Sequence, residues 1–461
     1  MAELILGVSG ARGIVGETLD ERIAVRLALA FASGLGPGPV VIGRDSRPSG
    51  RPLAGAAIAA LASEGRAVLD LGLAPTPTVQ VAVEAEGAAG GVVITASHNP
   101  PAWNGLKFIS PAGTFLDAPA MKDLIARFEA AGGCGRGGSA ERPAASLPAS
   151  AAAAGERAVR VHLERILRAS DRERIRAAAL RVVVDAVHGA APVLIGPLLA
   201  ALGVEVRWID GEPDGRLPAR PEPRAERLEP LARVTEEARA QVGFALDPDG
   251  DRCALVLPGE VLGEEWALPL CAYHLLAQGA RGPLVANLST SARLDWVAAR
   301  YGVPVERTPV GEAHVVSRMK SRAAMLGGEG NGGVIDPRVH YGRDAGVAIS
   351  HLLGLEATGP GGRGGIARAV ALFPPMVLIK RELAISRKFL GALEQELARH
   401  LGAPGDRQDG LRWSWADRWL HVRPSGTEPH VRVFAEAAAR ETAEQMVATV
   451  EACAAPWLER P

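Results

Sequence analysis

The sequence has few of the features that mark secreted, membrane-bound or nucleic-acid-binding proteins. Its 461 residues contain four cysteines, Cys134, Cys253, Cys271 and Cys453, without Cys-x-x-Cys spacing, which argues against a zinc site or a disulfide framework. The formal net charge is −1, so the chain has no bulk electrostatic attraction for nucleic acid or a membrane surface. We therefore expect a small-molecule partner.

Long apolar runs are also missing. No segment approaches 18 uninterrupted apolar residues, and the chain does not start with a basic stretch followed by an apolar run and a cleavage site. This pattern predicts a soluble, cytoplasmic protein. Apolar residues nevertheless make up 48% of the chain, enough for several hydrophobic cores. The composition does not distinguish a monomer from a dimer.

Strand-like runs alternate with amphipathic helical stretches over most of the chain, which is typical of α/β domains with parallel or mixed sheets. Residues 131–156, rich in Gly, Ala, Ser and Pro, indicate a linker, and the Gly-rich residues 354–365 indicate a second break. Close-spaced strands after this break suggest antiparallel hairpins beside a helix. We predict three α/β domains, 1–150, 151–254 and 255–366, and a smaller C-terminal α+β domain, 367–461.

The acidic loop DPDGDR follows an apolar strand and places Asp247, Asp249 and Asp251 at alternate positions. Three carboxylates this close repel one another unless a cation lies among them, and a hard divalent ion suits oxygen ligands. An EF-hand calcium loop would need Gly at 252 and Glu at 258, where this chain has Arg and Pro. A solvated acidic turn is the other alternative, and we favour the metal site.

Ser97 occupies a comparable position, because the apolar strand 90–94 leads into TASHNPP. Strand ends are where α/β proteins place ligand-binding residues. The nucleophile elbow of hydrolases is excluded, since Thr95 and Asn99 stand where that motif needs glycines. A purely structural serine in a rigid loop is the alternative.

The segment RPSGTEP, residues 423–429, offers a guanidinium, two hydroxyls and backbone amides in a tight turn. Such a group of donors suits a phosphate dianion. As an isolated motif it is also compatible with a polar hairpin.

Four motifs in order, TASHNPPAWNGLKF, DPDGDR, GGEGNGG and RPSGTEP, together with SGARGIVGE near the start, resemble those of the α-D-phosphohexomutases. This family contains the phosphoglucomutases, phosphomannomutases and phosphoglucosamine mutases, and the resemblance covers nearly the whole chain. It implies four domains, three of a shared α/β type and a fourth α+β, around a central cleft. Asn331 in GGEGNGG makes the chain more similar to archaeal-type members.

The resemblance implies that Ser97 carries a phosphoryl group, donates it to the substrate and recovers it at the end of each cycle. Asp247, Asp249 and Asp251 would bind Mg²⁺ together with a phosphoryl oxygen on Ser97. The three aspartates and a phosphoserine of about −2 exceed the charge of the ion by roughly 3 units. Cations are therefore expected nearby.

Arg12, Lys107 and Arg252 are the expected cations, each with a surface ion pair as its alternative. Arg12 and Lys107 match positions that assist proton transfer or stabilise the transferring phosphoryl group. Arg252 is expected at the substrate. His98 is expected to shape the loop or contact phosphate rather than act as the catalytic base.

The remaining motifs imply contacts with the substrate. Glu329 and Asn331 match the loop that contacts sugar hydroxyls, and Gly311 and Glu312 in TPVGEAHV match a second specificity loop. The phosphate that is not reacting would be held by residues of the fourth domain, namely Arg423, Ser425, Gly426, Thr427 and Arg432.

The implied reaction moves a phosphoryl group between the 1- and 6-positions of an aldohexose phosphate through a hexose 1,6-bisphosphate, which also serves as activator. Rotation of the fourth domain about 354–365 would gate the cleft. A sugar-phosphate phosphatase and a non-catalytic sugar-phosphate-binding protein are the alternatives. The preferred hexose among glucose, mannose and glucosamine stays open.

Overall fold

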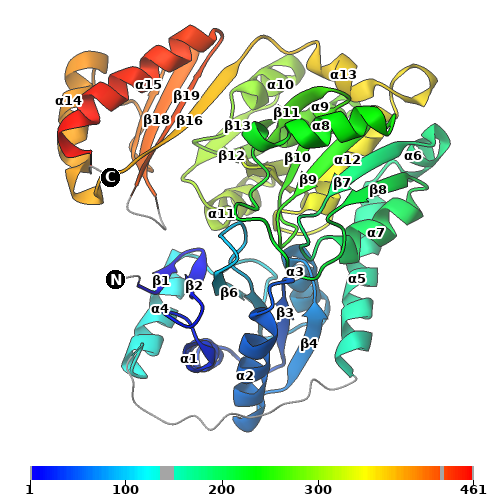
Figure 1. Cartoon of the computed structure of the whole chain (residues 1–461), viewed down its shortest axis with the longest axis vertical. Coiled ribbons are helices and arrows are strands. Elements are labelled where there is room, and N and C mark those ends of the chain that lie inside the picture. The colour runs from blue at the N-terminus through cyan, green and yellow to red at the C-terminus, as the bar shows by residue number, and fades with distance from the viewer. Residues whose placement is uncertain (1–2, 135–149, 426–429, 459–461) are drawn as a thin grey trace.

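The computed structural model describes residues 3–134, 150–425 and 430–458. The described chain forms four sheets, each with its own helices (Figure 1). In the described ranges, none of the helices combines the length and hydropathy needed to cross a bilayer.

The first unit is a six-stranded sheet in the order β1-β2-β6-β5-β3-β4. Asp20 begins its first helix by accepting a hydrogen bond from the amide of Ile23, and Asp117 caps its last helix in the same way. The elements are β1 (Ile5–Gly7), β2 (Gly10–Ile14), α1 (Glu21–Ala32), β3 (Val40–Arg44), α2 (Gly50–Ser63), β4 (Val68–Leu73), α3 (Thr76–Ala85), β5 (Gly90–Ile94), β6 (Trp103–Ile109) and α4 (Ala118–Ala130).

The second unit has the strand order β11-β10-β9-β7-β8. It consists of α5 (Ser150–Ala169), α6 (Arg172–Ala178), β7 (Arg181–Asp185), α7 (Pro192–Ala201), β8 (Glu205–Ile209), η1 (Ala225–Arg227), α8 (Glu229–Glu237), β9 (Val242–Leu246), β10 (Cys253–Leu257), β11 (Glu260–Gly263) and η2 (Glu264–Trp266).

The third unit has the order β13-β12-β14-β15. It consists of α9 (Ala267–Ala277), β12 (Leu284–Asn287), α10 (Arg293–Tyr301), β13 (Val305–Thr308), α11 (Glu312–Arg322), β14 (Leu326–Glu329), β15 (Gly333–Ile335), α12 (Ala345–Glu356), η3 (Pro360–Gly362) and α13 (Gly365–Val370).

These three units share one strand arrangement. In each of them three parallel strands are followed by an antiparallel fourth, as β4-β3-β5-β6, β8-β7-β9-β10 and β13-β12-β14-β15. The predicted Ser97, aspartate and sugar-contacting loops all connect the third strand of this set to the fourth. The repeated topology therefore gives each predicted loop the same place in its own unit, at the carboxyl end of a parallel strand.

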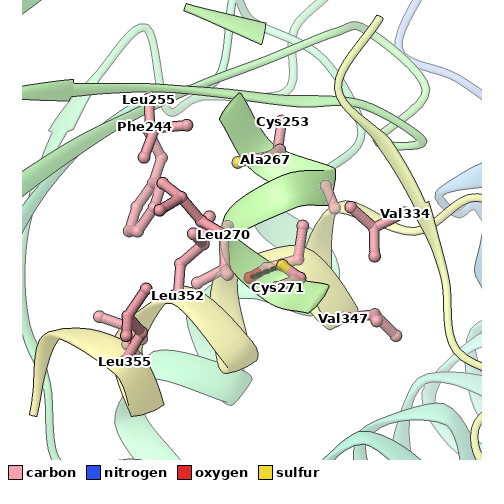
Figure 2. Packing of buried hydrophobic residues seen from close by; sticks show 14 of the residues in the cluster. Phe244, Cys253, Leu255, Ala267, Leu270, Cys271, Val334, Val347, Leu352 and Leu355 are labelled. Atoms are coloured by element: carbon pink, nitrogen blue, oxygen red, sulfur yellow. Dashed lines mark hydrogen bonds between the residues drawn. The ribbon is translucent and has the colours of Figure 1, made fainter. Parts of the chain in front are cut away.

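A single hydrophobic core joins the second and third units. Figure 2 shows Phe244 and Leu255 of the second unit in one cluster with Leu270, Cys271 and Leu352 of the third. Every residue of α12 is buried, so this helix is covered on all sides rather than on one face. The two units therefore pack as one body.

Helix α5 connects the first unit to this body. Its early residues Ala154 and Ala158 pack in the core of the first unit, whereas Ile166 belongs to the shared core of the second and third. The expected linker 131–156 thus differs from the structure at its end, because residues 150–156 are helical. Residues 135–149 of that linker lie outside the described residues.

The fourth unit is an antiparallel sheet in the order β16-β19-β18-β17, as expected for a C-terminal α+β domain. In Figure 1 it lies apart from the other sheets, at the upper left. Its elements are β16 (Val377–Leu383), η4 (Arg387–Phe389), α14 (Leu390–Leu401), β17 (Leu411–Ser414), β18 (Arg418–Pro424), β19 (Val431–Ala437), α15 (Arg440–Ala454) and η5 (Ala455–Trp457).

The expected hinge at 354–365 is wrong. Residues 354–356 are the buried end of α12, and Ile366 and Ala369 in α13 are buried in the shared core. Phe373 is then held by aromatic contacts, with ring centroids 4.5 Å from Trp296 and 5.1 Å from Trp266. The connection between this buried region and β16 is therefore the short segment 374–376.

Candidate active site

Ser97 follows β5 in a tightly constrained loop. Its backbone is in the left-handed region, with φ of +51°, where a non-glycine residue costs roughly 1–2 kcal/mol. The amide of Ser97 donates to Oγ1 of Thr95, at 2.8 Å, and Pro100 and Pro101 stiffen the end of the loop. A strained residue at a strand end is typical of a functional position.

Arg47, which the sequence analysis missed, fixes this loop. It is fully buried and paired with Asp45, with 3.1 Å between Nε and Oδ2, and Thr95 donates to the same Asp45 oxygen at 2.6 Å. The guanidinium also donates to four backbone carbonyls of the loop, those of Ser97, Asn99, Pro100 and Trp103. Five donors in a rigid plane can hold a loop in this way, whereas a lysine cannot.

The three aspartates lie together in the loop between β9 and β10. All are fully buried, and one oxygen from each lies within 4.8 Å of the others. Gly250 allows the tight turn between them with φ of +71°. Oδ1 of Asp249 and Oδ1 of Asp251 are buried without a hydrogen-bond partner. Buried carboxylate oxygens left unpaired fit a hard divalent cation such as Mg²⁺.

The carboxylates differ in their electrostatic surroundings. Burial, together with Asp251 and Asp249, raises the pKa of Asp247 well above its usual range. Burial would also raise the pKa of Asp249, but Lys107 outweighs it and lowers that pKa. The Nζ of Lys107 lies 2.6 Å from Asp249 and 3.4 Å from Asp251. The cluster therefore carries more negative charge than its lysine neutralises.

The fold brings Ser97 to this cluster. Its Oγ lies 3.3 Å from Oδ2 of Asp247, although 150 residues separate them. A second contact fixes the same junction, since the hydroxyl of Thr76 at the start of α3 donates to Asp249 at 2.5 Å. The predicted serine and the predicted aspartates thus form one site from two units.

The other predicted cations also lie here. Arg12 is 9% exposed and donates to Oδ1 of Asn99 at 2.6 Å. Arg252 donates to Glu222 at 2.7 Å, and its Nε lies 3.6 Å from Asp251. Nδ1 of His98 lies 3.4 Å from Oγ of Ser97. Burial, together with Arg252, holds the pKa of His98 well below its ordinary value.

Arg343 is a second residue that the sequence analysis missed. Its guanidinium joins three carboxylates, with distances of 2.7 Å to Asp251, 3.0 Å to Glu312 and 2.6 Å to Glu329. These acids outweigh burial and raise the pKa of Arg343 well above its ordinary value. Arg343 therefore couples the aspartate loop to both predicted specificity loops.

The predicted sugar-contacting residues separate into two groups. Glu329 accepts hydrogen bonds from the amide of Gly311, at 2.9 Å, and from the side chain of Asn287, at 2.8 Å. Among the described residues, Gly311, Glu312 and Glu329 do not line the cavity that lies between the four units, whereas Asn331 does. In this structure the two glutamates support the loops, and Asn331 lines the cavity while its Oδ1 accepts from the amide of Gly333 at 3.1 Å.

Arg423 and Arg432 lie opposite each other on β18 and β19 and both line the cavity. Oδ2 of Asp409 accepts from Arg423 at 2.8 Å and from the amide of Val310 at 2.9 Å, which ties the fourth unit to the third. Ser425 is buried, and its amide donates to the carbonyl of His430. The predicted Gly426 and Thr427 lie outside the described residues.

A cavity of about 340 Å³ lies between the units. Its wall includes residues from all four, among them His98, Arg252, Asn331, Lys380, Arg423 and Arg432. Lys380 of β16 reaches η2 at the end of the second unit, where its Nζ lies 2.7 Å from Glu264 and 2.8 Å from Glu265. The cavity wall therefore combines basic groups, such as Lys380, Arg423 and Arg432, with acidic groups, such as Glu264 and Glu265.

Sequence comparison identifies the family. Models of the phosphoglucomutase/phosphomannomutase domains match in order, with alpha/beta/alpha domain I at residues 3–132, domain II at 160–260, domain III at 264–362 and the C-terminal domain at 378–452. The chain is 33% identical over 448 residues to a probable phosphoglucosamine mutase of Methanopyrus kandleri, covering 95% of each chain. It belongs to the phosphoglucomutase/phosphomannomutase family.

Further relatives agree with this assignment to the phosphohexomutases. A phosphoglucomutase/phosphomannomutase of Thermococcus kodakarensis is 34% identical over 450 residues, or 96% of each chain. Like the Methanopyrus protein it is archaeal, in agreement with the resemblance of the motifs.

Solved structures share the whole fold. A putative phosphomannomutase from Thermus thermophilus has a TM-score of 0.80 at 26% identity, covering 98% of this chain and 99% of that one. A phosphoglucomutase/phosphomannomutase family protein from Burkholderia thailandensis has a TM-score of 0.79 at 25% identity, covering 99% and 98%. The expected enzyme class and fold class are confirmed.

A signal for the two missed arginines of this phosphohexomutase does exist in the sequence. Arg47 follows β3 in GRDSR, and Arg343 precedes α12 in YGRDAG, so both stand at element ends near polar turns. Strand-end reasoning, which led to Ser97 and the aspartates, applies to Arg47 as well. Arg343 has no such strand and could be found only through its partners.

Proposed function

We propose that the chain interconverts the 1- and 6-phosphates of an aldohexose by a phosphoserine mechanism centred on Ser97. One observation carries the proposal: Oγ of Ser97 lies 3.3 Å from Asp247, in a group of buried carboxylates, and its neighbour His98 lines the same cavity as Arg423 and Arg432. A phosphoryl donor beside the cavity and a pair of arginines on its wall suit a substrate that carries a phosphate at each end in turn.

Asp247, Asp249 and Asp251 would hold Mg²⁺. When bound, the ion would supply positive charge to the transferring phosphoryl group, which accumulates charge on its oxygens. Basic side chains around the ion would neutralise the remaining negative charge. Lys107 lies against Asp249 and Asp251, and Arg252 stands beside the same loop.

In the first half-reaction the P–O bond to Ser97 breaks and a new bond forms to the free hydroxyl of the hexose monophosphate. The hydroxyl loses its proton as the bond forms, and Oγ of Ser97, the leaving group, gains a proton, so the half-reaction ends with a free serine hydroxyl. Burial, together with Arg252, lowers the pKa of Arg12 to about 10, which brings this arginine nearest to proton exchange among the proposed cations. Lys107, whose pKa is raised by the aspartates despite its burial, stays charged.

The resulting 1,6-bisphosphate then turns end over end in the cavity. Its second phosphoryl group returns to Ser97, while Arg423 and Arg432 hold the phosphate that is not reacting. Reorientation requires the fourth unit to loosen its contacts across the cavity, which include Lys380 with Glu264 and Arg224 with Glu382. The bisphosphate, added in trace amounts, would prime unphosphorylated enzyme.

For the identity of the hexose we propose a range of substrates rather than a single sugar. Asn331 lines the cavity and offers both a donor and an acceptor, so it can face a hydroxyl or an amino group. The relatives named above include a probable phosphoglucosamine mutase and a phosphoglucomutase/phosphomannomutase. We therefore include glucose, mannose and glucosamine phosphates among the substrates.

A steady-state comparison tests the proposal. Glucose, mannose and glucosamine 1-phosphates are supplied with Mg²⁺ and a trace of hexose 1,6-bisphosphate, and 6-phosphate and free phosphate are both measured. We expect 6-phosphate without stoichiometric free phosphate, a loss of at least 10³-fold in Ser97→Ala, and normal rates in Ser110→Ala. Release of free phosphate would instead identify a phosphatase, and no turnover with retained binding would identify a sugar-phosphate-binding protein.

A further inference from the structure

A second convergent cluster lies away from the cavity, at the junction of the first, second and third units. His162 on α5, His340 in the turn after β15 and Asp344 before α12 are at most 3% exposed. Nε2 of His162 lies 2.7 Å from Oδ2 of Asp344, and Nε2 of His340 lies 3.3 Å from the same oxygen. The two rings stand nearly perpendicular, at 85°. Two imidazoles therefore present equivalent nitrogens to one carboxylate oxygen.

A neighbouring pair shows how unusual this arrangement is within the chain. Asp336 also faces a buried histidine, with 2.8 Å to Nε2 of His351, but its charge is paired with Arg338 at 2.5 Å. Asp344 has no such arginine among its recorded contacts in the described residues. The adjacent guanidinium of Arg343 is directed to Asp251, Glu312 and Glu329 instead. One ligand atom each of His162, His340 and Asp344 lie within 4.8 Å of one another, close enough to bind a single ion.

The surroundings of the cluster fix its ligand atoms. Oδ1 of Asp344 accepts from the amide of Gly346 at 2.8 Å, which leaves Oδ2 for the histidines. Nδ1 of His162 lies 3.0 Å from the hydroxyl of Thr78; in the tautomer whose Nδ1 donates to this hydroxyl, the lone pair of Nε2 is free for a metal ion. Outer contacts of this kind orient metal-binding histidines. His340 adds the second nitrogen.

We propose that His162, His340 and Asp344 form a binding site for a first-row transition metal ion, with Zn²⁺ as the preferred occupant. Two imidazole nitrogens and one carboxylate oxygen suit Zn²⁺, whereas Mg²⁺ prefers oxygen ligands alone. The chain thus holds two metal sites of different chemistry. The other site is formed by Asp247, Asp249 and Asp251, which offer oxygen ligands alone. The cysteine spacing led us to expect no zinc site, and the proposal departs from that expectation because its ligands are two histidines and an aspartate.

The consequence of such a site is structural. The ligands come from α5 and from the turn between β15 and α12, and Thr78 from α3 supports one of them. An ion there would clamp three units together. It would also fix the residue before Asp344, which is Arg343, and through it the aspartate and specificity loops.

The test uses the full chain, stripped of metal with a chelator, dialysed against excess Mg²⁺, and then given Zn²⁺ alone as the probe. After gel filtration, elemental analysis should find one Zn²⁺ per chain, and the Tm should rise by several degrees. His340→Asn and His162→Gln should lose both effects. His351→Gln, the matched buried histidine, and Asp249→Asn, in the aspartate cluster, should keep them.

A second measurement covers variants that fail to fold. The unmutated chain loaded with Co²⁺ should show the strong visible absorption of a low-coordinate ion with nitrogen ligands, and Zn²⁺ should abolish it while Mg²⁺ should not. Absence of bound Zn²⁺ in the unmutated chain, equal binding in His340→Asn, or displacement of Co²⁺ by Mg²⁺ would each overturn the proposal.

Discussion

Oγ of Ser97 lies 3.3 Å from Oδ2 of Asp247, across the boundary between the first two units. Neither the Ser97 loop nor the aspartate loop determines this distance by itself. Thr76 and Lys107 of the first unit both bind Asp249 of the second, at 2.5 and 2.6 Å, and so hold the two loops at one spacing. The reactivity that we propose for this serine would therefore depend on contacts between units, and these contacts can be tested singly.

Lys107 is the first of them. Lys107→Met keeps most of the side-chain volume but removes the charge between Asp249 and Asp251, so the site becomes more negative where a phosphoryl group must enter. We expect kcat to fall by about 10²–10³-fold, with a small change in Tm if Mg²⁺ is present. Lys122→Met, at an exposed position on α4, is the matched control, and equal rates in the two variants would remove Lys107 from the mechanism.

Arg47 tests whether the shape of the Ser97 loop matters. Arg47→Lys keeps the charge beside Asp45 but cannot reach four carbonyl oxygens, so the loop should relax from its left-handed conformation at Ser97. A displacement of about 1 Å lowers rates by roughly 10²-fold, and we expect a loss of that size in kcat with little change in KM. A raised KM at normal kcat would show that Arg47 acts on binding instead.

Much of the fold and part of the site could be predicted from the sequence, because their signals are local. Ser97 and the aspartates each follow a short apolar strand, and a strand end in an α/β domain is a binding position. The strand arrangement is repeated in the first three units, and in each of them the predicted loop joins the third strand to the fourth. The strand-end rule therefore places each loop at the same position of its own unit.

What could not be predicted depends on partners distant in the chain. Arg343 meets Asp251 from 92 residues away, and nothing in YGRDAG distinguishes it from a surface arginine. The prediction of a hinge at 354–365 was wrong for a related reason. These Gly-rich residues have the composition of a linker, but the local sequence does not reveal the units that bury α12 and α13. Composition reports conformational freedom, not burial by distant segments.

Glu265 should make stability depend on pH. Burial, together with Glu264, raises its pKa to about 7 despite Lys380. The folded state therefore binds a proton that the unfolded state, with a pKa of about 4.5, releases. This contribution to stability is complete below about pH 4.5 and is lost as the pH rises through 7, by at most about 3 kcal/mol.

Glu265→Gln cannot release this proton. The Tm of the variant relative to the unmutated chain should therefore rise from pH 4.5 to 7.5, and exposed Glu237→Gln should give a flat difference. A flat difference for Glu265→Gln as well would show that this carboxyl titrates normally in the folded chain.

Arg423 tests the phosphate end of the cavity. Arg423→Gln removes a charge-assisted contact to the phosphate that is not reacting and leaves Asp409 with one partner fewer. We expect KM for hexose 1-phosphate to rise about 10–100-fold, which corresponds to roughly 1.5–3 kcal/mol. Arg440→Gln, exposed on α15 of the same unit, should bind normally. An unchanged KM in Arg423→Gln would move the phosphate site elsewhere.

The phosphorylation of Ser97 is the most direct test of the mechanism. The chain is first freed of phosphate, then incubated with Mg²⁺ and hexose 1,6-bisphosphate, and analysed by intact mass and by peptide sequencing in a mass spectrometer. The account predicts one added phosphoryl group, on Ser97, that is discharged when excess hexose monophosphate is added. A chain that isomerises hexose phosphates while Ser97 stays unmodified, or that carries the group on another residue, would contradict it.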